Sequence, residues 1–303
     1  MKTGIAGAGS LGSLFASFFL RSGTDTALYE ISPGTIESIR SGLKIITPDG
    51  ESVYHPAISG KSSILSDADA VFIFVKSYST REAAADIAGA IKKDAIIVSL
   101  QNGLGNYEVL KEFFPAEQIV YGTTTYGAAK RSPSEIVFGG AGTVNIGGRS
   151  TAAVHRISEL LETAGCSVSV TDNPDKAVWL KALINAGINP VASILSIRNG
   201  QILDNPYALD LQRSILEEAV QAAQSAGHNF DADKIIEETR TVCGKTAANI
   251  CSMLQDIEAG RKTEIDSINI KIAETGEAAG LNMNYNRAVS YIINALGARG
   301  AKE

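Results

Sequence analysis

The chain has 303 residues, of which 45% are hydrophobic and 20% are charged, and its formal net charge is −6. This length exceeds what one hydrophobic core usually organises, so we expect two domains. The acidic balance has the wrong sign for binding to nucleic acid or to an anionic membrane surface, and we expect neither as a partner.

The three cysteines, Cys166, Cys243 and Cys251, form no C-x-x-C pair and are odd in number. They indicate neither a disulfide framework nor a zinc site, and no metal site is expected. A reducing, cytoplasmic location fits this usage best. The uncharged stretch 5–20 is interrupted by three glycines and lacks a small-x-small cleavage site. We interpret it as folded interior and not as a secretion signal.

The first half of the chain alternates short apolar runs with helical patterns. Continuous apolar strands that are separated by helices indicate a parallel sheet covered on both faces. We therefore predict a doubly wound α/β domain over residues 1–172. Its strands are predicted at 3–6, 26–29, 70–75, 95–100 and 118–121, and its helices at 11–22, 34–41, 80–92 and 107–113.

Two segments of this half break the alternation. A Pro-Asp-Gly turn at 48–50 lies between β-prone residues and predicts a hairpin over 44–54. Segment 135–146 also has the pattern of paired strands, with three glycines within 139–142 at its turn. The sheet is therefore expected to gain antiparallel strands late in the domain.

Turn residues at 171–174 separate this half from a second half with helical periodicity. We expect residues 173–303 to form an all-helical domain that supplies one wall of a binding cleft. Its helices are predicted at 175–197, 206–226, 231–242, 246–259, 263–279 and 284–298.

Residues 7–12, Gly-Ala-Gly-Ser-Leu-Gly, match G-x-G-x-x-G between the first predicted strand and helix. The first glycine of this motif permits a tight turn, the second lets the backbone approach a pyrophosphate, and the third allows close helix–strand packing. The helix N-terminus favours the negative charge. An acid, Glu30, ends the second strand, as in Rossmann-type units. We predict a dinucleotide site at Gly7, Gly9, Ser10, Leu11, Gly12 and Glu30; a purely structural turn is the alternative.

Glu30 also bears on the choice of coenzyme. Its carboxylate can accept hydrogen bonds from a ribose 2′-OH, whereas it would repel the 2′-phosphate of NADP. No arginine follows at Ile31 or in the two residues after it. These residues favour NADH, unless Glu30 is only a solvated acid at the end of a strand.

The three histidines, His55, His155 and His228, form no recognisable catalytic arrangement. They are scattered in polar contexts, and we expect them to be exposed. If a hydride is transferred, another residue must protonate the developing alkoxide.

The first helix of the second domain offers such a residue. Its segment 179–190 is mostly apolar except for Lys181, Asn185 and Asn189, which are spaced i, i+4, i+8 and form one polar stripe. A buried lysine is either paired or has a lowered pKa, and both conditions suit a proton donor near neutral pH.

Pro190 ends this stripe and is expected to kink the helix, because it removes the hydrogen bond to Ala186. The alternative is structural. Lys181 then extends to water, and the two asparagines serve the kinked backbone.

Further polar groups occur near the C-terminus. Asn249 and Ser252 are expected one helical turn apart on the predicted helix. Thr263 is predicted to cap the next helix. On the residues alone, Glu264 is an acid favoured by the helix dipole, unless it faces the same cleft as Lys181.

Together these motifs resemble the ketopantoate reductase family over nearly the whole chain. The glycine motif is generic, but Lys-x-x-x-Asn-x-x-x-Asn-Pro at 181–190, Ser-Met-x-Gln-Asp at 252–256 and Thr-Glu-Ile-Asp at 263–266 are specific. Gln-Asn-Gly-Leu-Gly at 101–105 and Asn-Gly at 199–200 complete the pattern. The resemblance implies NADPH-dependent reduction of 2-dehydropantoate, a small 2-keto acid, to (R)-pantoate on the route to pantothenate.

The resemblance also implies roles for individual residues. Lys181 would protonate the keto oxygen as hydride arrives at C2, and Glu264 would anchor the substrate. Lys76 matches a cofactor-site lysine, with an ordinary strand-end charge as the alternative, and Asn102 matches a residue near both nicotinamide and substrate. The implied polar substrate wall comprises Asn102, Asn185, Asn189, Asn199, Asn249 and Ser252.

One position departs from the family pattern. Members that use NADPH typically carry an arginine just after the second strand, where this chain has Ile31 after Glu30. NADH is therefore an open alternative as coenzyme. Relatives that reduce other branched 2-keto acids to D-2-hydroxy acids are similar in outline, and a protein that senses NAD(H) without turnover is a third hypothesis. We expect a monomer or a homodimer.

Overall fold

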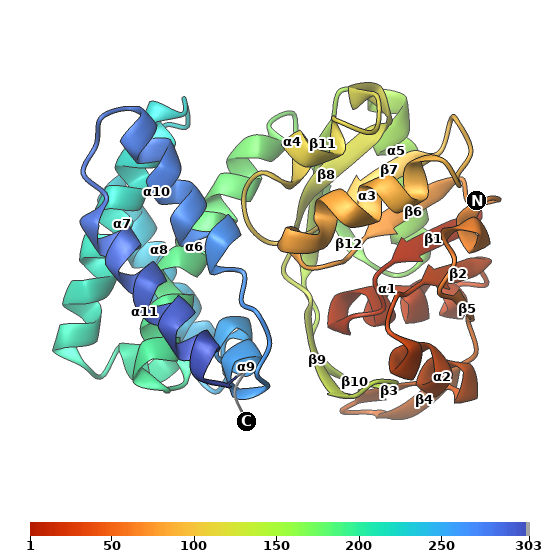
Figure 1. Ribbon diagram of the computed structural model, residues 1–303, viewed down its shortest axis with the longest axis horizontal. Helices are drawn as coiled ribbons and strands as arrows, with labels where there is room; N and C mark the ends of the chain where they lie inside the picture. The colour runs from red at the N-terminus through yellow and green to blue at the C-terminus, as the bar shows by residue number, and fades with distance from the viewer. Residues whose placement is uncertain (301–303) are drawn as a thin grey trace. The chain divides into compact units, whose positions relative to one another are not determined.

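The computed structural model describes residues 1–300 and consists of two compact units (Figure 1). The first unit comprises Met1–Gln101 and Asn106–Ala177. The second comprises Asn102–Gly105 and the chain from Val178 onward. Four residues from the first half of the sequence thus belong to the second unit.

The first unit is built on an eight-stranded sheet in the order β12-β11-β8-β7-β6-β1-β2-β5. The strands are β1 (Thr3–Ala6), β2 (Thr26–Tyr29), β5 (Ala57–Ser59), β6 (Ala70–Ile73), β7 (Ile96–Ser99), β8 (Ile119–Thr124), β11 (Thr143–Gly148) and β12 (Ser167–Val170). Neighbouring strands are parallel except β8 and β11, which are antiparallel. This arrangement confirms the predicted α/β fold with a late antiparallel strand.

Five helices accompany this sheet. They are α1 (Ser10–Arg21), α2 (Pro33–Ser41), α3 (Thr80–Ala88), α4 (Asn106–Leu110) and α5 (Thr151–Thr163). Helix α1 buries Phe15 and Phe19 completely, and the ring of Phe19 lies 5.0 Å from that of Phe72 on β6. The uncharged stretch that begins the chain is therefore interior, because its apolar strand and helix pack on each other.

A second, four-stranded sheet has the order β4-β3-β10-β9. Its strands are β3 (Leu43–Thr47), β4 (Gly50–Tyr54), β9 (Gly127–Ser132) and β10 (Glu135–Gly140). The antiparallel pair of β3 and β4 confirms the predicted hairpin over 44–54.

The hairpin predicted over 135–146 is wrong. Strand β10 pairs with β9 and β3, whereas β11 pairs with β8 and β12 in the other sheet. The glycines at the turn explain the difference. Gly140 has a φ of 124°, and a Cβ on Gly142 would lie 2.4 Å from the backbone of Thr125. Glycine therefore lets the chain turn from one sheet into the other.

The second unit contains helices and short 3-10 turns. These are α6 (Pro174–Leu195), whose residues up to Ala177 belong to the first unit, η4 (Asn199–Ile202), α7 (Pro206–Ser225), α8 (Ala232–Lys245), α9 (Ser252–Glu258), η5 (Ile265–Ser267), α10 (Asn269–Ala278) and α11 (Asn284–Gly300). Helix α7 contacts α8, α10 and α11. Helix α6 has the length and composition of a membrane span, but 61% of that apolar window is buried inside the protein, as in a core helix.

Two predicted helices of this unit have different bounds. The helix predicted over 246–259 starts only at Ser252, because the preceding turn bonds elsewhere: the backbone N–H groups of Asn199 and Gly200 donate to the carbonyls of Asn249 and Ala247. The helix predicted over 263–279 is interrupted at Ile268, whose φ of −109° and ψ of −94° are not helical. Asn249 therefore lies outside the helix that Ser252 begins.

Candidate active site

Four neighbouring parallel strands, β2, β1, β6 and β7, place their carboxyl ends along one edge of the large sheet. Glu30 follows β2, the glycine loop follows β1, and Lys76 comes shortly after β6. In open α/β sheets, ligands bind outside the carboxyl ends of the strands. This edge is the candidate cofactor site of the first unit.

The three loop glycines meet different demands. Gly7 has a φ of 98°, and a Cβ on Gly12 would lie 2.0 Å from the carbonyl oxygen of Gly7. A Cβ on Gly9 would meet only the carbonyl oxygen of Phe74, at 4.0 Å. The protein's own packing requires Gly7 and Gly12, whereas Gly9 leaves room in front of the loop.

Helix α1 begins at Ser10 directly behind this loop. No side chain caps its first N–H groups, and its first turn contains no acid. Leu11 is half-buried in that first turn. An anion is the group that such a helix N-terminus accepts best, so the loop and helix fit the pyrophosphate of a dinucleotide.

Glu30 is tied to the glycine loop. Its Oε2 accepts a hydrogen bond from the N–H of Ala8 at 2.8 Å, and its Oε1 accepts one from the N–H of Ser32 at 2.9 Å. The carboxylate is therefore held in place and is not merely a solvated acid. The next residue, Ile31, is 66% exposed.

Lys130 is a further charged residue at this loop. Its Nζ donates to the carbonyl oxygen of Ala8 at 3.3 Å. The residue lies on β9, whose short polar sequence gives no strand signal. No local pattern in the sequence therefore indicates that Lys130 lies at the glycine loop.

A buried amide fixes the strand ends beside Lys76. Gln101 is 7% exposed, and its Nε2 donates to the carbonyl of Val75 at 2.7 Å and to Oγ1 of Thr80 at 2.8 Å. Its Oε1 accepts from Oγ of Ser99 at 2.9 Å. The backbone that leads into Lys76 is thus bound to the end of β7.

Asn102 begins the four-residue segment that belongs to the second unit. Leu104 N–H donates to the carbonyl of Ser267 at 2.7 Å, and the N–H of Ser267 donates to the carbonyl of Glu264 at 3.1 Å. A Cβ on Gly103, whose φ is 84°, would lie 2.4 Å from Oγ of Ser267. Only glycine permits this close approach, which brings the Asn102 segment to the turn that carries Glu264.

Lys181 and Glu264 share one electrostatic environment in the second unit. Lys181 is half-buried on α6, and loss of water around its ammonium lowers its pKa to about 8, an effect that the negative charge of Glu264 opposes. Glu264 is 8% exposed. The two predicted catalytic residues are therefore brought together, although they lie on separate elements.

Hydrogen bonds link other residues of the predicted substrate wall. The N–H of Asn199 donates to the carbonyl of Asn249 at 3.0 Å. The Sγ of Cys251 donates to the carbonyl of Asn189 at 3.6 Å and accepts from the N–H of Leu254 at 3.5 Å. Cys251 thus caps α9 and ties its N-terminus to α6.

The side chains of this wall differ in exposure. Asn189 and Asn199 are buried, Asn185 is half-buried on α6, and Asn249 and Ser252 are exposed. The expectation of a helical turn between Asn249 and Ser252 is wrong, because Cys251 is the N-cap between them.

The histidines differ from each other as well. His55 and His155 are exposed, as predicted. His228 is half-buried, with its ring 5.5 Å from that of Trp179, so the expectation of exposure is wrong for this residue. The polar turn sequence around His228 gives no indication that its ring contacts Trp179 on α6.

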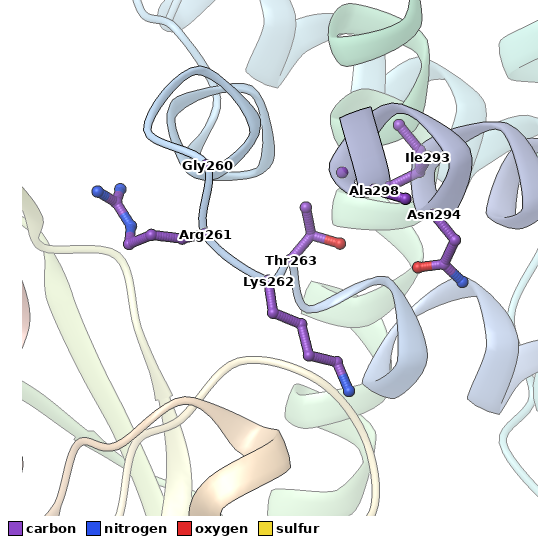
Figure 2. A pocket seen from close by; sticks show the side chains of 8 residues that line it. Gly260, Arg261, Lys262, Thr263, Ile293, Asn294 and Ala298 are labelled. Carbon is purple, nitrogen blue, oxygen red and sulfur yellow. The ribbon is translucent and has the colours of Figure 1, made fainter. Parts of the chain in front are cut away.

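A small hollow lies in the second unit next to Glu264 in the chain (Figure 2). It is lined by Gly260, Arg261, Lys262, Thr263, Ile293, Asn294, Gly297 and Ala298. Arg261 donates to Asp256 at 2.9 Å, and Lys262 forms an ion pair with Asp266 at 2.9 Å. None of the predicted substrate residues lines this hollow.

Known proteins match both units. Residues 3–150 match the family model of ketopantoate reductase PanE/ApbA, and residues 173–297 match the model of its C-terminal part. The chain is 34% identical to 2-dehydropantoate 2-reductase from Halobacterium salinarum, covering 90% of this chain and 91% of that one. It is 32% identical to the enzyme of the same name from Archaeoglobus fulgidus, covering 96% of each chain.

The fold matches solved structures over its full length. The ternary structure of D-mandelate dehydrogenase with NADH and anilino(oxo)acetate is similar, with a TM-score of 0.94, 25% sequence identity and 99% coverage of both chains. With a glycine loop on one unit, a lysine–glutamate pair on the other and family matches over both, the chain belongs to the ketopantoate reductase family.

Proposed function

We propose that this protein is a 2-dehydropantoate 2-reductase of pantothenate biosynthesis. It reduces the C2 ketone of 2-dehydropantoate to the hydroxyl of (R)-pantoate with a nicotinamide cofactor. The observation that carries the proposal is the half-buried Lys181 beside the buried Glu264, because this reaction needs a proton donor for the ketone oxygen.

The residues at the carboxyl edge of the large sheet would hold the cofactor. The glycine loop and the N-terminus of α1 would bind its pyrophosphate, Glu30 would bind the adenosine ribose, and Lys76 would be a further cofactor-site residue. When bound, the cofactor supplies the hydride. The preference is for NADH, because Glu30 presents a fixed carboxylate and Ile31 offers no cation for a 2′-phosphate. The NADH in the similar D-mandelate dehydrogenase supports this preference.

The chain's own residues handle the proton and the substrate. Lys181 donates a proton to the ketone oxygen as negative charge develops there, and a hydroxyl results. Its pKa of about 8 keeps it mainly protonated at neutral pH while allowing the proton to leave. Glu264 supports the ammonium and anchors the substrate, and Asn102, Asn185, Asn189, Asn199, Asn249 and Ser252 form the polar wall around it.

A steady-state assay tests the proposal. The purified protein is mixed with 2-dehydropantoate and with NADH or NADPH in turn, and oxidation of the coenzyme is followed by absorbance. We expect turnover with a higher kcat/KM for NADH. Absence of oxidation with both coenzymes would contradict the proposed function.

A second candidate is a dehydrogenase of D-2-hydroxy acids that acts on other branched 2-keto acids. The observation in its favour is the close match to D-mandelate dehydrogenase. The ratio of kcat/KM values for 2-ketoisovalerate, 2-ketoisocaproate and 2-dehydropantoate separates the two activities. A cytoplasmic monomer or homodimer is the form that we propose for the protein.

A further inference from the structure

Pro190 removes one backbone hydrogen bond from α6. A proline has no backbone N–H, so the carbonyl of Ala186, four residues earlier, lacks its helical donor. Ala186 is completely buried, so bulk water cannot donate a hydrogen bond to its carbonyl oxygen. This carbonyl lies between Asn185 and Asn189, on the helix that also carries Lys181.

Asn269 supplies the missing donor. Its Nδ2 lies 3.3 Å from the carbonyl oxygen of Ala186 and donates to it. Asn269 is the first residue of α10, and its side chain is completely buried. A residue 83 positions away in the sequence therefore completes the hydrogen bonding of α6.

A second asparagine fixes which way the Asn269 amide points. Asn286 Nδ2 donates to the carbonyl of Ile215 at 3.0 Å and to Oε2 of Glu218 at 2.9 Å. Both partners can only accept, so Asn286 must turn its Oδ1 toward Asn269, whose Nδ2 donates to it at 3.1 Å. Asn269 thus uses its Nδ2 for both bonds, one to Asn286 and one to Ala186. The flipped amide, with Oδ1 in place of Nδ2, is excluded because it would face two acceptors.

We propose that Asn269 is a positioning residue for the reductase. By binding the carbonyl that Pro190 leaves without a donor, it holds the backbone of α6 and thereby the polar face of Lys181, Asn185 and Asn189. Loss of this bond would leave a buried carbonyl unpaired, and α6 would shift to satisfy it. Small displacements of a proton donor reduce turnover strongly. This inference rests on the proposed function.

The chain offers a matched control in Gln212. This buried amide donates to the carbonyl of Gly187 at 3.2 Å, one residue further along α6. The Gly187 carbonyl faces the N–H of Val191 in the helix, so the bond from Gln212 is additional. Gln212→Leu removes a buried amide of the same kind without depriving α6 of an essential donor.

A double-mutant cycle tests the proposal. Wild type, Asn269→Leu, Pro190→Ala and the double variant are compared by kcat and KM for 2-dehydropantoate, by the pH at which kcat falls, and by Tm. In the wild-type background we expect Asn269→Leu to lower kcat about tenfold, which corresponds to about 1.4 kcal/mol. Pro190→Ala restores the N–H, so Asn269→Leu should then lower kcat less than about twofold.

Several outcomes would overturn the inference. These are equal losses of kcat from Asn269→Leu in both backgrounds, an equally large loss from Gln212→Leu, or coupling in Tm without coupling in kcat. If Asn269→Leu does not fold, Asn269→Asp takes its place, because it keeps the shape and loses the N–H donor. Failure of the proposed function has a different signature, since wild type itself would then bind cofactor and reduce no keto acid.

Discussion

At the scale of single residues, the protonation of Lys181 governs the proposed chemistry. Burial lowers its pKa and the Glu264 carboxylate opposes this effect, and the net result is a pKa of about 8. The balance leaves an ammonium that is charged at neutral pH and can give up its proton. Neither residue alone would provide this, because burial without a carboxylate would neutralise the lysine further.

We expect Lys181→Ala to lower kcat for ketone reduction by about 10²- to 10⁴-fold, the range of general acid catalysis. The Kd for NADH should stay within about twofold, because the group acts in the transition state. Lys234→Ala on the exposed face of α8 is the control and should retain wild-type kcat. Unchanged kcat in Lys181→Ala would contradict the role of Lys181 as the proton donor.

The pH dependence of reduction follows from the same pKa. The reaction needs the protonated lysine, so kcat/KM should be constant well below pH 8 and fall about tenfold per unit well above it. Glu264→Gln removes the charge that raises the pKa of Lys181, and the fall should move to lower pH. The measurement is kcat/KM for 2-dehydropantoate against pH, and a Glu264→Gln profile displaced to higher pH would contradict the assigned coupling.

At the scale of elements, the glycine loop combines a packing requirement with a binding requirement. Gly12 contacts the Gly7 backbone so closely that any side chain collides, whereas Gly9 faces open space. The two positions are therefore expected to respond differently to the same substitution, although both are glycines of the same motif.

We expect Gly12→Ala to lower Tm, because its Cβ would lie 2.0 Å from the Gly7 oxygen. Gly9→Ala should keep the wild-type Tm and weaken NADH binding at least about tenfold, since its Cβ would occupy the approach to the pyrophosphate. Tm and fluorescence titration with NADH measure the two effects. Tight NADH binding by a folded Gly9→Ala protein would argue against a cofactor at this loop.

The end of β2 determines the coenzyme preference that we propose. Glu30→Arg removes the repulsion toward a 2′-phosphate but also two hydrogen bonds, to Ala8 and Ser32. We expect it to raise the NADPH/NADH ratio of kcat/KM and to lower kcat/KM with NADH.

Ile31→Arg adds a cation at an exposed position and leaves both bonds of Glu30 intact. It should improve kcat/KM with NADPH while preserving NADH use, and Ile31→Gln serves as its uncharged control. An unaltered NADPH/NADH ratio in both Glu30→Arg and Ile31→Arg would place the ribose elsewhere.

At the scale of the whole molecule, the elements with strong local signals were predictable. Strands β1 and β2 have the predicted bounds, because short apolar runs between turn residues need no distant information. Strand β12 was missed because it is a mostly exposed edge strand with two serines. Strand β10 was given the wrong partner, since its pairing with β3 joins segments far apart in the sequence.

The candidate site divides in the same way. The glycine loop and the stripe on α6 follow from local spacing, and the sequence was sufficient to find them. The proximity of Lys181 to Glu264 depends on how α6 packs against the turn before η5, which spacing cannot reveal. The bond from Asn269 to Ala186 is equally non-local, although Pro190 signalled that a carbonyl needed a donor.

Cofactor binding should stabilise the protein as a whole. A ligand that binds only the folded chain at 100 times its Kd adds about 2.7 kcal/mol to the free energy of unfolding. We therefore expect NADH to raise Tm equally in wild type and in Lys181→Ala, as measured by differential scanning fluorimetry. A rise in wild type alone would mean that Lys181 contributes to cofactor affinity and not only to turnover.

The placement of Asn102–Gly105 has a consequence for how this protein can evolve. These four residues are encoded between two elements of the first unit, yet they pack with the second. A single recombination event near the codon for Ala177 would therefore transfer the helical half without Leu104, whose N–H donates to the Ser267 carbonyl. We therefore expect the two halves to be inherited together. A fusion of the helical half to another nucleotide-binding half would also have to include residues Asn102–Gly105.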